Sequence, residues 1–398
     1  FCAMHIRALF LQHQAQTSPA PLGLEVSRAE GCRIYDTQGR AYWDLIAGIS
    51  VSAYGHMHPE INAAVIEQVH RHAHVMVYGE MIQAPQALLA AKLSRMLPEP
   101  LNSVYLTNSG TEAIEGAVKL ARRFTGKPWM VAQRDAYHGS TVGALSLMSD
   151  EYFTSAYRPL VPGVRFIRQN DTRSLNVINR DTAAVVLEFV QAERGCKVAD
   201  LAYIQAVAQR CKEVNALLIA DEIQTGMGRT GTLFAFEQYG VVPDILVCGK
   251  AFGAGYPLAA FVASKEIMAA LSDNPVLGHI TTFGGHPVCC AAAVKGLELM
   301  ETTDLPKRAA QLGAIFKARL TSVHGIEISG SGALLAVKLP SADHCRAFIA
   351  KALELGVITD WFLFAPDAFR IAPPLVMTDE EAETISEILL RALHEILI

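Results

Sequence analysis

The sequence predicts an α/β fold, in which a large domain holds a mainly parallel seven-stranded sheet and a smaller domain is α+β. Short apolar runs bounded by glycine, proline or charge are typical of buried parallel strands. Because these runs alternate with helical patterns, we expect one sheet that helices cover on both faces. The runs lie at 104–106, 129–131, 164–167, 184–187, 217–220, 245–248 and 259–262.

Helical periodicity between the runs supports the same arrangement. In 203–214, four apolar residues lie three or four positions apart and share one helix face. These residues are Ile204, Val207, Ala208 and Cys211. After residue 297 the alternation stops, and the pattern predicts the α+β region. Its expected helices are 305–322, 342–355 and 380–397, and its expected strands lie near 326–328 and 334–337.

The N-terminal part of the chain predicts a hairpin. Residues 31–36 and 40–45 alternate between apolar and polar side chains about a turn at 37–39. We therefore divide the chain into three parts. These are an N-terminal segment, 1–55, a large domain, 56–296, and a C-terminal small domain, 297–398.

The composition indicates a globular protein and excludes several classes. Hydrophobic residues make up 51% of the chain and charged residues 18%, as in a protein with a large core. The net charge of −5 includes no basic block, so we expect no nucleic-acid partner. We also expect no membrane segment, no signal peptide and no metal site. The eight scattered cysteines fit reduced thiols of a cytoplasmic protein.

Two charged residues mark the probable ligand-binding edge of the predicted sheet. Asp221 ends the run 217–220, and Lys250 follows the run 245–248. In open α/β sheets, ligands bind at the carboxyl ends of the strands. A carboxylate and an amine placed there suit a cofactor that needs a partner for a cation and an amine for covalent attachment.

A third feature of this edge is the segment 108–113, which joins a predicted strand to a predicted helix. Small residues let the backbone approach a phosphate, and a helix N-terminus offers free N–H groups and a positive dipole end. The alternative is an ordinary helix N-cap formed by Ser109 or Thr111. Because Asp221 and Lys250 are predicted at the same sheet edge, we favour the phosphate site over the ordinary N-cap.

Together these motifs resemble those of the class III aminotransferases, pyridoxal-phosphate enzymes that include acetylornithine, ornithine and 4-aminobutyrate aminotransferases. The resemblance runs from about Gly31 to Pro374. It implies the fold type I aminotransferase fold, with the N-terminal segment as part of the small domain. It also implies a homodimer with shared sites and pyridoxal 5'-phosphate as the cofactor.

The resemblance assigns most of the cofactor-binding residues. Lys250 is implied to form the Schiff base and to act as general acid and base, and Asp221 to pair with the ring nitrogen. Gln224 resembles the residue that bonds the ring hydroxyl. The remaining candidates are Ser109, Gly110 and Thr111 for the phosphate, Tyr137 for stacking on the ring, and His138 and Glu188 beside it.

Two of these assignments carry further content. For His138 we favour a structural role over a catalytic one. Thr282 lies in a Thr-aromatic-Gly-Gly motif, at 282–285, and is implied to bind the phosphate of the neighbouring subunit.

The predicted substrate side combines one family feature with two departures. Glu193 and Arg370 match a pair that closes for an amine and opens when the arginine grips a dicarboxylate. Arg194 adds a second cation beside Glu193, which predicts a perturbed gate. Ser140 stands where the acetylornithine, ornithine and 4-aminobutyrate enzymes usually carry a carboxylate-binding arginine. The aromatic run 361–364 is either small-domain core or an apolar wall at the pocket mouth.

These features predict an aminotransferase that moves an amino group from a primary amine or ω-amino acid to a 2-oxo acid by a ping-pong mechanism. An acetylornithine- or ornithine-type donor is the first alternative. Decarboxylation, racemisation or an aminomutase shift on the same fold is the second. A non-catalytic cofactor-binding module belongs to a different class, and the turnover of an amine donor separates it from an enzyme.

Overall fold

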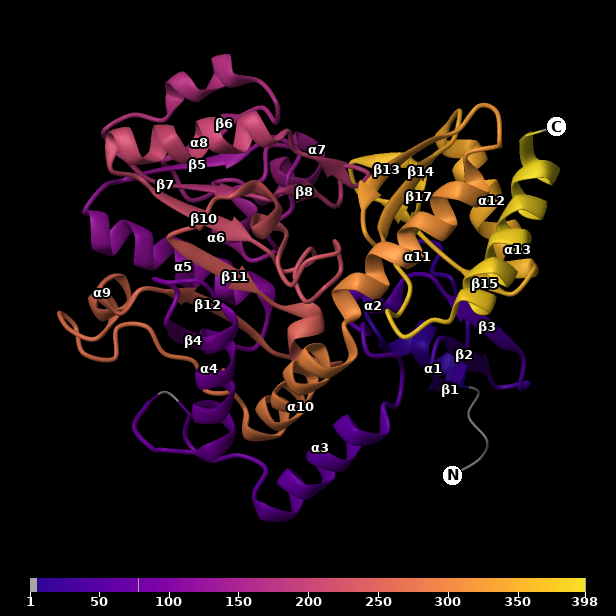
Figure 1. Cartoon of the computed structure of the whole chain (residues 1–398), viewed down its shortest axis with the longest axis horizontal. Coiled ribbons are helices and arrows are strands. Elements are labelled where there is room, and N and C mark those ends of the chain that lie inside the picture. Colours follow the sequence, from indigo (N-terminus) through magenta and orange to yellow (C-terminus); the bar gives the residue numbers. More distant parts are fainter. Residues whose placement is uncertain (1–5, 78, 398) are drawn as a thin grey trace.

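A seven-stranded sheet forms the centre of the large domain (Figure 1). The computed structural model describes residues 6–77 and 79–397. The strand order is β4-β12-β11-β10-β7-β5-β6, and β12 alone among them runs antiparallel to its neighbours. The bounds are β4 Ser103–Thr107, β5 Trp129–Gln133, β6 Val164–Ile167, β7 Thr182–Leu187, β10 Leu217–Asp221, β11 Ile245–Cys248 and β12 Ala259–Ala263. Each predicted run forms one of these strands, which confirms the fold class.

Helices cover both faces of this sheet because successive strand residues point to opposite sides. Helix α5 (Gly110–Thr125) shares its buried cluster with Ile219 of β10. Helix α8 (Leu201–Val214) shares a different cluster with the next residue back, Leu218. The four residues predicted to form one face of α8 are all buried. The sheet is therefore apolar on both faces, and its polar groups lie at the strand ends.

The large domain contains further short elements around the sheet. Its other helices are α3 (Pro59–Arg71), α4 (Ala84–Met96), α6 (Val142–Leu145), α7 (Glu151–Thr154), α9 (Lys265–Met268) and α10 (Pro287–Thr303), and β8 (Val190–Gln191) pairs with β9 (Lys197–Val198). Proline occupies the first turn of α3, α4 and α10, where its missing N–H costs no helical hydrogen bond.

The small domain joins the two ends of the chain. Its first sheet has the order β1-β2-β3-β15, so the N-terminal hairpin pairs with a strand from the C-terminal part. Its second sheet has the order β13-β14-β17-β16. The strands are β1 Val26–Glu30, β2 Arg33–Asp36, β3 Ala41–Asp44, β13 Glu327–Ser331, β14 Leu334–Lys338, β15 Val357–Ile358, β16 Trp361–Phe362 and β17 Ala365–Ile371. The helices are α1 Ile6–His13, α2 Ala47–Ser50, α11 Leu305–Leu320, α12 Ala342–Glu354 and α13 Asp379–Leu397.

Two details qualify this description. The segment named α2 is a left-handed turn, because each of its four residues has a positive φ. Helix α10 runs through residue 296, where the sequence divides the large domain from the small one. The division into 1–55, 56–296 and 297–398 stays a prediction.

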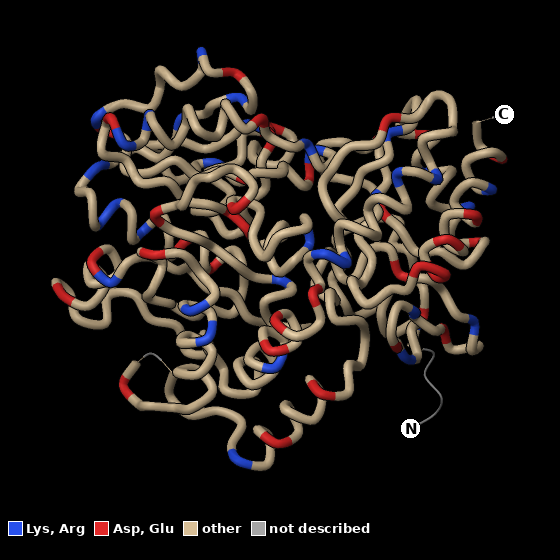
Figure 2. Tube along the Cα trace, viewed as in Figure 1, with Lys and Arg blue, Asp and Glu red and all other residues tan. Residues whose placement is uncertain are grey.

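Charged residues of both signs are scattered over the chain trace (Figure 2). Several charged side chains are nevertheless buried, and four of them lie at or just after strands β7, β8 and β10. They are Glu188, Glu193, Asp221 and Glu222. Because a buried charge is costly unless it is paired, this edge of the sheet is where the structure departs from ordinary packing.

Two properties of the whole chain follow from the described residues. None of the described helices has the length and apolar content that a bilayer crossing requires. The cysteines in the described part are free thiols, and most are buried. Burial raises the pKa of Cys32 to about 12, so this thiol is neutral near pH 7.

The contact between α5 and β12 gives a test of the packing. A Cβ at Gly116 would lie 2.3 Å from Cε1 of Phe261, so Gly116→Ala forces the helix or the ring to move. We expect the free energy of unfolding to fall by about 1–3 kcal/mol, measured by urea denaturation. Phe261→Leu should relieve the contact, so the double variant should lose less stability than the two single losses added together. Simple additivity would contradict this account.

Candidate active site

The carboxyl ends of the parallel strands surround a cavity of about 300 Å³. It is lined by Gly110, Thr111, Tyr137, His138, Gly139, Ser140, Glu188, Glu193, Asp221, Ile223, Gln224 and Lys250. The structure thus brings together residues from the ends of β4, β5, β7, β10 and β11. Three sequence candidates lie outside this lining. They are Ser109, Thr282 and Arg370.

Lys250 lies two residues beyond the end of β11. Its φ is +48°, a left-handed conformation that non-glycine residues rarely adopt and that occurs often at functional sites. Its Nζ donates a hydrogen bond to Oε1 of Gln224 at 2.6 Å. Burial lowers the pKa of Lys250 to about 8, against smaller opposing effects of nearby carboxylates such as Glu193. The side chain therefore holds a substantial fraction of neutral, nucleophilic amine near neutral pH.

Asp221 is buried at the end of β10 and is bonded on both oxygens. His138 Nδ1 lies 2.6 Å from its Oδ2, and the backbone N–H of Ile223 donates to its Oδ1 at 3.1 Å. Sequence reasoning placed His138 in a structural role and missed this direct contact. The signal for it was the position of His138 just after β5, on the same sheet edge. The two contacts hold the Asp221 carboxylate in a fixed position at the strand end.

Glu188 follows β7 and lies close to Asp221. It accepts a hydrogen bond from the backbone N–H of Tyr137 at 3.4 Å. Burial raises the pKa of Glu188 well above its ordinary value, and the Asp221 carboxylate raises it further. Two carboxylates in one buried space are costly to ionise together, and Glu188 is the one whose pKa is raised.

The N-terminus of α5 forms the opposite wall of the cavity. Ser109 is the N-cap, and its Oγ accepts from the backbone N–H of Glu112 at 3.4 Å. The structure therefore contains the helix N-cap that the sequence offered as the alternative role of Ser109. Thr111 Oγ1 lies 2.7 Å from Oγ1 of Thr141. A Cβ at Gly139 would lie 2.4 Å from Thr111 Oγ1, so only glycine lets the two segments meet. The first N–H groups of this helix lack intrahelical partners by construction of any α-helix.

Glu193 and Arg370 form the predicted pair across the two domains. Arg370 Nη2 donates to Glu193 Oε1 at 3.0 Å, and Arg370 is buried. A second carboxylate, Asp360, accepts from Arg370 Nε at 2.8 Å. Sequence reasoning missed Asp360. Burial lowers the pKa of Arg370, but Glu193 and Asp360 outweigh it, and the net shift is upward.

Arg194 is bonded elsewhere than to Glu193. Its guanidinium reaches Oδ2 of Asp135 at 3.4 Å and Oε1 of Gln191 at 3.2 Å, and its effect on the pair stays a prediction. Adjacent residues in this turn point in different directions, so proximity along the chain did not give proximity of charge.

None of the aromatic run 361–364 lines the cavity, and only part of the run is core. Phe362 is core and lies under the Arg370 guanidinium, 4.3 Å from the ring centroid. Trp361 is half-exposed. Phe364 packs edge-on against Phe153 of α7.

Ser140 and Tyr137 form the neutral part of the lining. Their hydroxyl oxygens lie 3.0 Å apart. Ser140 therefore presents a short, uncharged hydroxyl to the cavity. The family resemblance would have led us to expect a carboxylate-binding arginine at this position. Thr282 is exposed on a bend of the chain, away from this cavity.

The lining fits pyridoxal phosphate. Gln224 lines the cavity, and its Nε2 is buried without a hydrogen-bond partner among the described residues. His138 Nε2 is likewise unpartnered in the described structure. One cavity therefore contains four groups that suit this cofactor. They are a helix N-terminus for the phosphate, a buried carboxylate for the ring nitrogen, an open amide donor and an amine of lowered pKa.

Comparisons with known proteins agree with this geometry. The family model described as aminotransferase class-III matches residues 14–393. The chain is 35% identical over 371 residues to the acetylornithine aminotransferase of Methanothermobacter thermautotrophicus, covering 92% of each chain. It is 35% identical over 395 residues to the putrescine aminotransferase of Pectobacterium atrosepticum, covering 94% of this chain and 84% of the relative. The structure matches the ornithine aminotransferase of Toxoplasma gondii with a TM-score of 0.92 and 30% identity, over 98% and 94% of the two chains.

The environment of Lys250 predicts a pH dependence. Because its pKa is lowered to about 8, the neutral amine should become abundant well below the ordinary lysine value of 10.5. The rate at which cofactor-free protein captures pyridoxal phosphate should rise with pH with a midpoint near 8. Stopped-flow absorbance measures this rate.

Gln224→Glu is the matched control, because it places a carboxylate beside Lys250 Nζ with little change in shape. A negative neighbour favours the charged amine, so the midpoint should move to higher pH. A wild-type midpoint near 10.5 would contradict the lowered pKa.

Proposed function

Because the chain belongs to the class III aminotransferases, a family of pyridoxal-phosphate enzymes, we propose that it moves an amino group from a primary amine or ω-amino acid to a 2-oxo acid. The observation that carries the proposal is the placement of Lys250 and Asp221 at neighbouring strand ends of one cavity. Ser140 on the same wall defines the substrate class, because it offers no cation to a donor carboxylate. Pyruvate or 2-oxoglutarate is the acceptor.

Different residues of the cavity would bind different parts of the cofactor. The N-terminus of α5, through Ser109, Gly110 and Thr111, holds the phosphate with backbone N–H groups and the positive helix end. Tyr137 covers one face of the ring. Gln224 donates its free Nε2 to the ring hydroxyl.

Asp221 and Lys250 carry out the chemistry. When bound, the cofactor withdraws electrons from the substrate's amine-bearing carbon and so makes its proton acidic. Asp221 accepts a hydrogen bond from the protonated ring nitrogen, and His138 holds this carboxylate in place. Lys250 would supply the amine for covalent attachment. Once the amine of the donor displaces it, the freed Nζ would take the proton from that carbon and return it nearby. A pKa of about 8 suits a group that must both accept and donate a proton near neutral pH.

The transfer proceeds in two half-reactions. The donor leaves as a ketone or aldehyde while its nitrogen stays with the enzyme, and the 2-oxo acid then enters and takes that nitrogen. Both substrates use one cavity, so its charge must suit an amine and then a carboxylate. Glu193 and Arg370 are the groups of opposite sign that meet this requirement.

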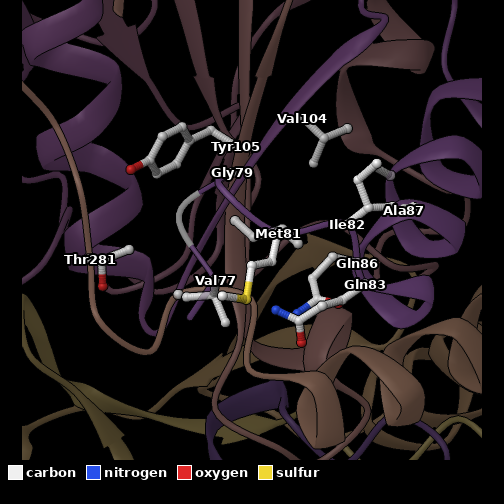
Figure 3. Close-up of a pocket in the computed structure, with 13 residues that line it drawn as sticks. Val77, Gly79, Met81, Ile82, Gln83, Gln86, Ala87, Val104, Tyr105 and Thr281 are labelled. Atoms are coloured by element: carbon white, nitrogen blue, oxygen red, sulfur yellow. The ribbon is translucent and has the colours of Figure 1, made fainter. Parts of the chain in front are cut away.

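We further propose that the enzyme is a cytoplasmic homodimer with shared sites. Free cysteines support the compartment. Beside Thr281 lies an apolar groove of about 370 Å³, in which Val77 and Met81 lie side by side (Figure 3). Ile82 at this groove is 101% exposed and Met81 is 51% exposed, as expected of an interface that a partner covers. A second copy seated there would reach Thr282, whose hydroxyl then binds the phosphate of the neighbouring site.

A donor comparison tests the substrate class. Ser140→Arg adds a cation where a donor carboxylate would lie, and a charge-assisted hydrogen bond is worth about 10- to 150-fold in affinity. Wild type should therefore prefer an apolar primary amine to N-acetylornithine, and Ser140→Arg should shift kcat/KM toward N-acetylornithine. Lys250→Ala is the blank, because it removes the amine that every cofactor-dependent turnover requires.

The acetylornithine aminotransferases among the relatives favour a second candidate, a donor of the acetylornithine or ornithine type. A tenfold or greater wild-type preference for N-acetylornithine would establish that candidate and refute the argument from Ser140.

Shared sites have a separate test. In a heterodimer of one Thr282→Ala chain and one Lys250→Ala chain, one site would carry both defects and the other neither. About half of the wild-type activity should then survive, since a symmetric dimer has two equivalent sites. If Thr282 acts within its own chain, each site carries one defect and the heterodimer should be nearly inactive.

A further inference from the structure

A half-buried carboxylate outside the cavity lining accepts three hydrogen bonds from the loop that follows β5. Oε1 of Glu115 accepts from Oγ1 of Thr141 at 2.7 Å, from the backbone N–H of Gly143 at 3.0 Å and from that of Ala144 at 3.2 Å. Glu115 belongs to α5. The three bonds therefore tie the loop to the helix whose N-terminus would hold the cofactor phosphate.

Thr141 extends this connection from Glu115 to the cavity. Its hydroxyl has a single hydrogen, which it donates to Glu115. Because Thr141 Oγ1 also lies 2.7 Å from Oγ1 of Thr111, Thr111 is the donor of that second bond. The backbone N–H of Thr141 donates in turn to Thr111 Oγ1 at 3.3 Å. The hydroxyl of Thr111, which lines the cavity, is thus held through both its hydrogen and its oxygen.

The same contacts fix the position of Ser140. On one side Gly139 packs against Thr111, since a Cβ at Gly139 would overlap the threonine hydroxyl. On the other side Thr141 is bonded to Thr111 and Glu115. Both chain neighbours of Ser140 are therefore attached to α5. A shift of this loop would move Ser140 relative to the helix N-terminus.

Glu115 also serves as a helix cap. Thr141 is the N-cap residue of α6 but forms no side-chain cap hydrogen bond, so Glu115 supplies the acceptor from another helix. A cap role alone predicts a lower melting temperature with no specific effect on ligands. A positioning role predicts weaker binding of the ligands that contact Thr111 and Ser140.

We propose that Glu115 is a positioning residue, which acts through Thr141 to fix Thr111 at the phosphate end of the cavity and Ser140 at the donor end. It rests on the proposed function, because the roles of Thr111 and Ser140 are taken from there. Glu115 does not line the cavity, so it would touch neither cofactor nor donor. Its loss should weaken the binding of both, while the groups at the ends of β10 and β11 keep their places.

Two variants separate the hydrogen bonds of Glu115 from its charge. Glu115→Ala removes the acceptor, whereas Glu115→Gln keeps Oε1 and loses only the charge. Glu115→Ala should raise the Kd of pyridoxal 5'-phosphate for the cofactor-free protein about tenfold, the scale of one lost charge-assisted hydrogen bond. Glu115→Gln should stay within about threefold of wild type. Fluorescence titration measures this Kd and needs no turnover.

Kinetics of the holoenzyme with butylamine as the donor give a second readout. At saturating cofactor, Glu115→Ala should raise KM for butylamine about tenfold and leave kcat within about threefold, because the groups that move the proton are untouched. A general loss of folded protein would lower kcat and leave KM unchanged.

Further variants test the connection through Thr141. Thr141→Val removes the middle hydroxyl and keeps the shape of the side chain. Because both changes break one connection, Glu115→Ala combined with Thr141→Val should bind the cofactor no more weakly than Glu115→Ala alone. Glu301→Ala is the matched control, since it removes a glutamate that pairs with Lys92 and should change neither Kd nor KM.

The outcomes are distinct. The expected Kd values without turnover of any amine would support the role of Glu115 and refute the proposed function. Unchanged Kd and KM in folded Glu115→Ala would overturn the role of Glu115. A loss of kcat alone, or equal losses in Glu115→Ala and Glu115→Gln, would also overturn it.

Discussion

The site depends on the carboxyl group of Asp221, which is buried at the end of β10. A carboxylate taken out of water is costly unless hydrogen bonds and an opposite charge compensate it. His138 and the backbone N–H of Ile223 supply those bonds, and the protonated ring nitrogen of the cofactor would supply the charge. The neighbouring Glu188 has no such set of partners, and burial together with the Asp221 carboxylate raises its pKa well above the ordinary value.

The same burial acts with the opposite sign on Lys250. Desolvation disfavours a charged amine, so the pKa falls to about 8 although carboxylates surround the group. The site therefore contains an amine, Lys250, whose pKa is lowered and a carboxyl group, Glu188, whose pKa is raised. Both depend on strand ends at the centre of a rigid sheet, where β10 and β11 are hydrogen-bonded neighbours. Preorganisation of this kind lowers the reorganisation that a proton transfer requires.

The sequence was informative wherever the chain obeys a local rule. Apolar runs gave the seven strands, and an amphipathic pattern gave α8, because burial imposes both patterns directly. Strand-end positions identified Asp221 and Lys250 for the same reason. The same rule placed His138 on this sheet edge but not its contact with Asp221, because the strand order, with β7 between β5 and β10, is not a local property of the sequence.

Side-chain direction was a second limit of the sequence. Arg194 follows Glu193 along the chain yet contacts Asp135, and Asp360 lies ten residues before Arg370 yet contacts it. Turns decide both outcomes. The turn after β8 sends two adjacent side chains apart, while the turn between β16 and β17 folds a carboxylate back onto the arginine.

The cavity as a whole separates two electrostatic regions, and that separation orients the ligand. The N-terminus of α5 is positive and attracts a phosphate, whereas the wall formed by Glu193 and its neighbours is negative and attracts an amine. Lys250 lies between them with its Nζ bonded to Gln224. A phosphorylated cofactor and a cationic donor can each bind in one orientation only. The amine therefore meets the reactive end of the cofactor without a further residue that binds the donor. Ser140 preserves this polarity because it adds no cation to the donor side.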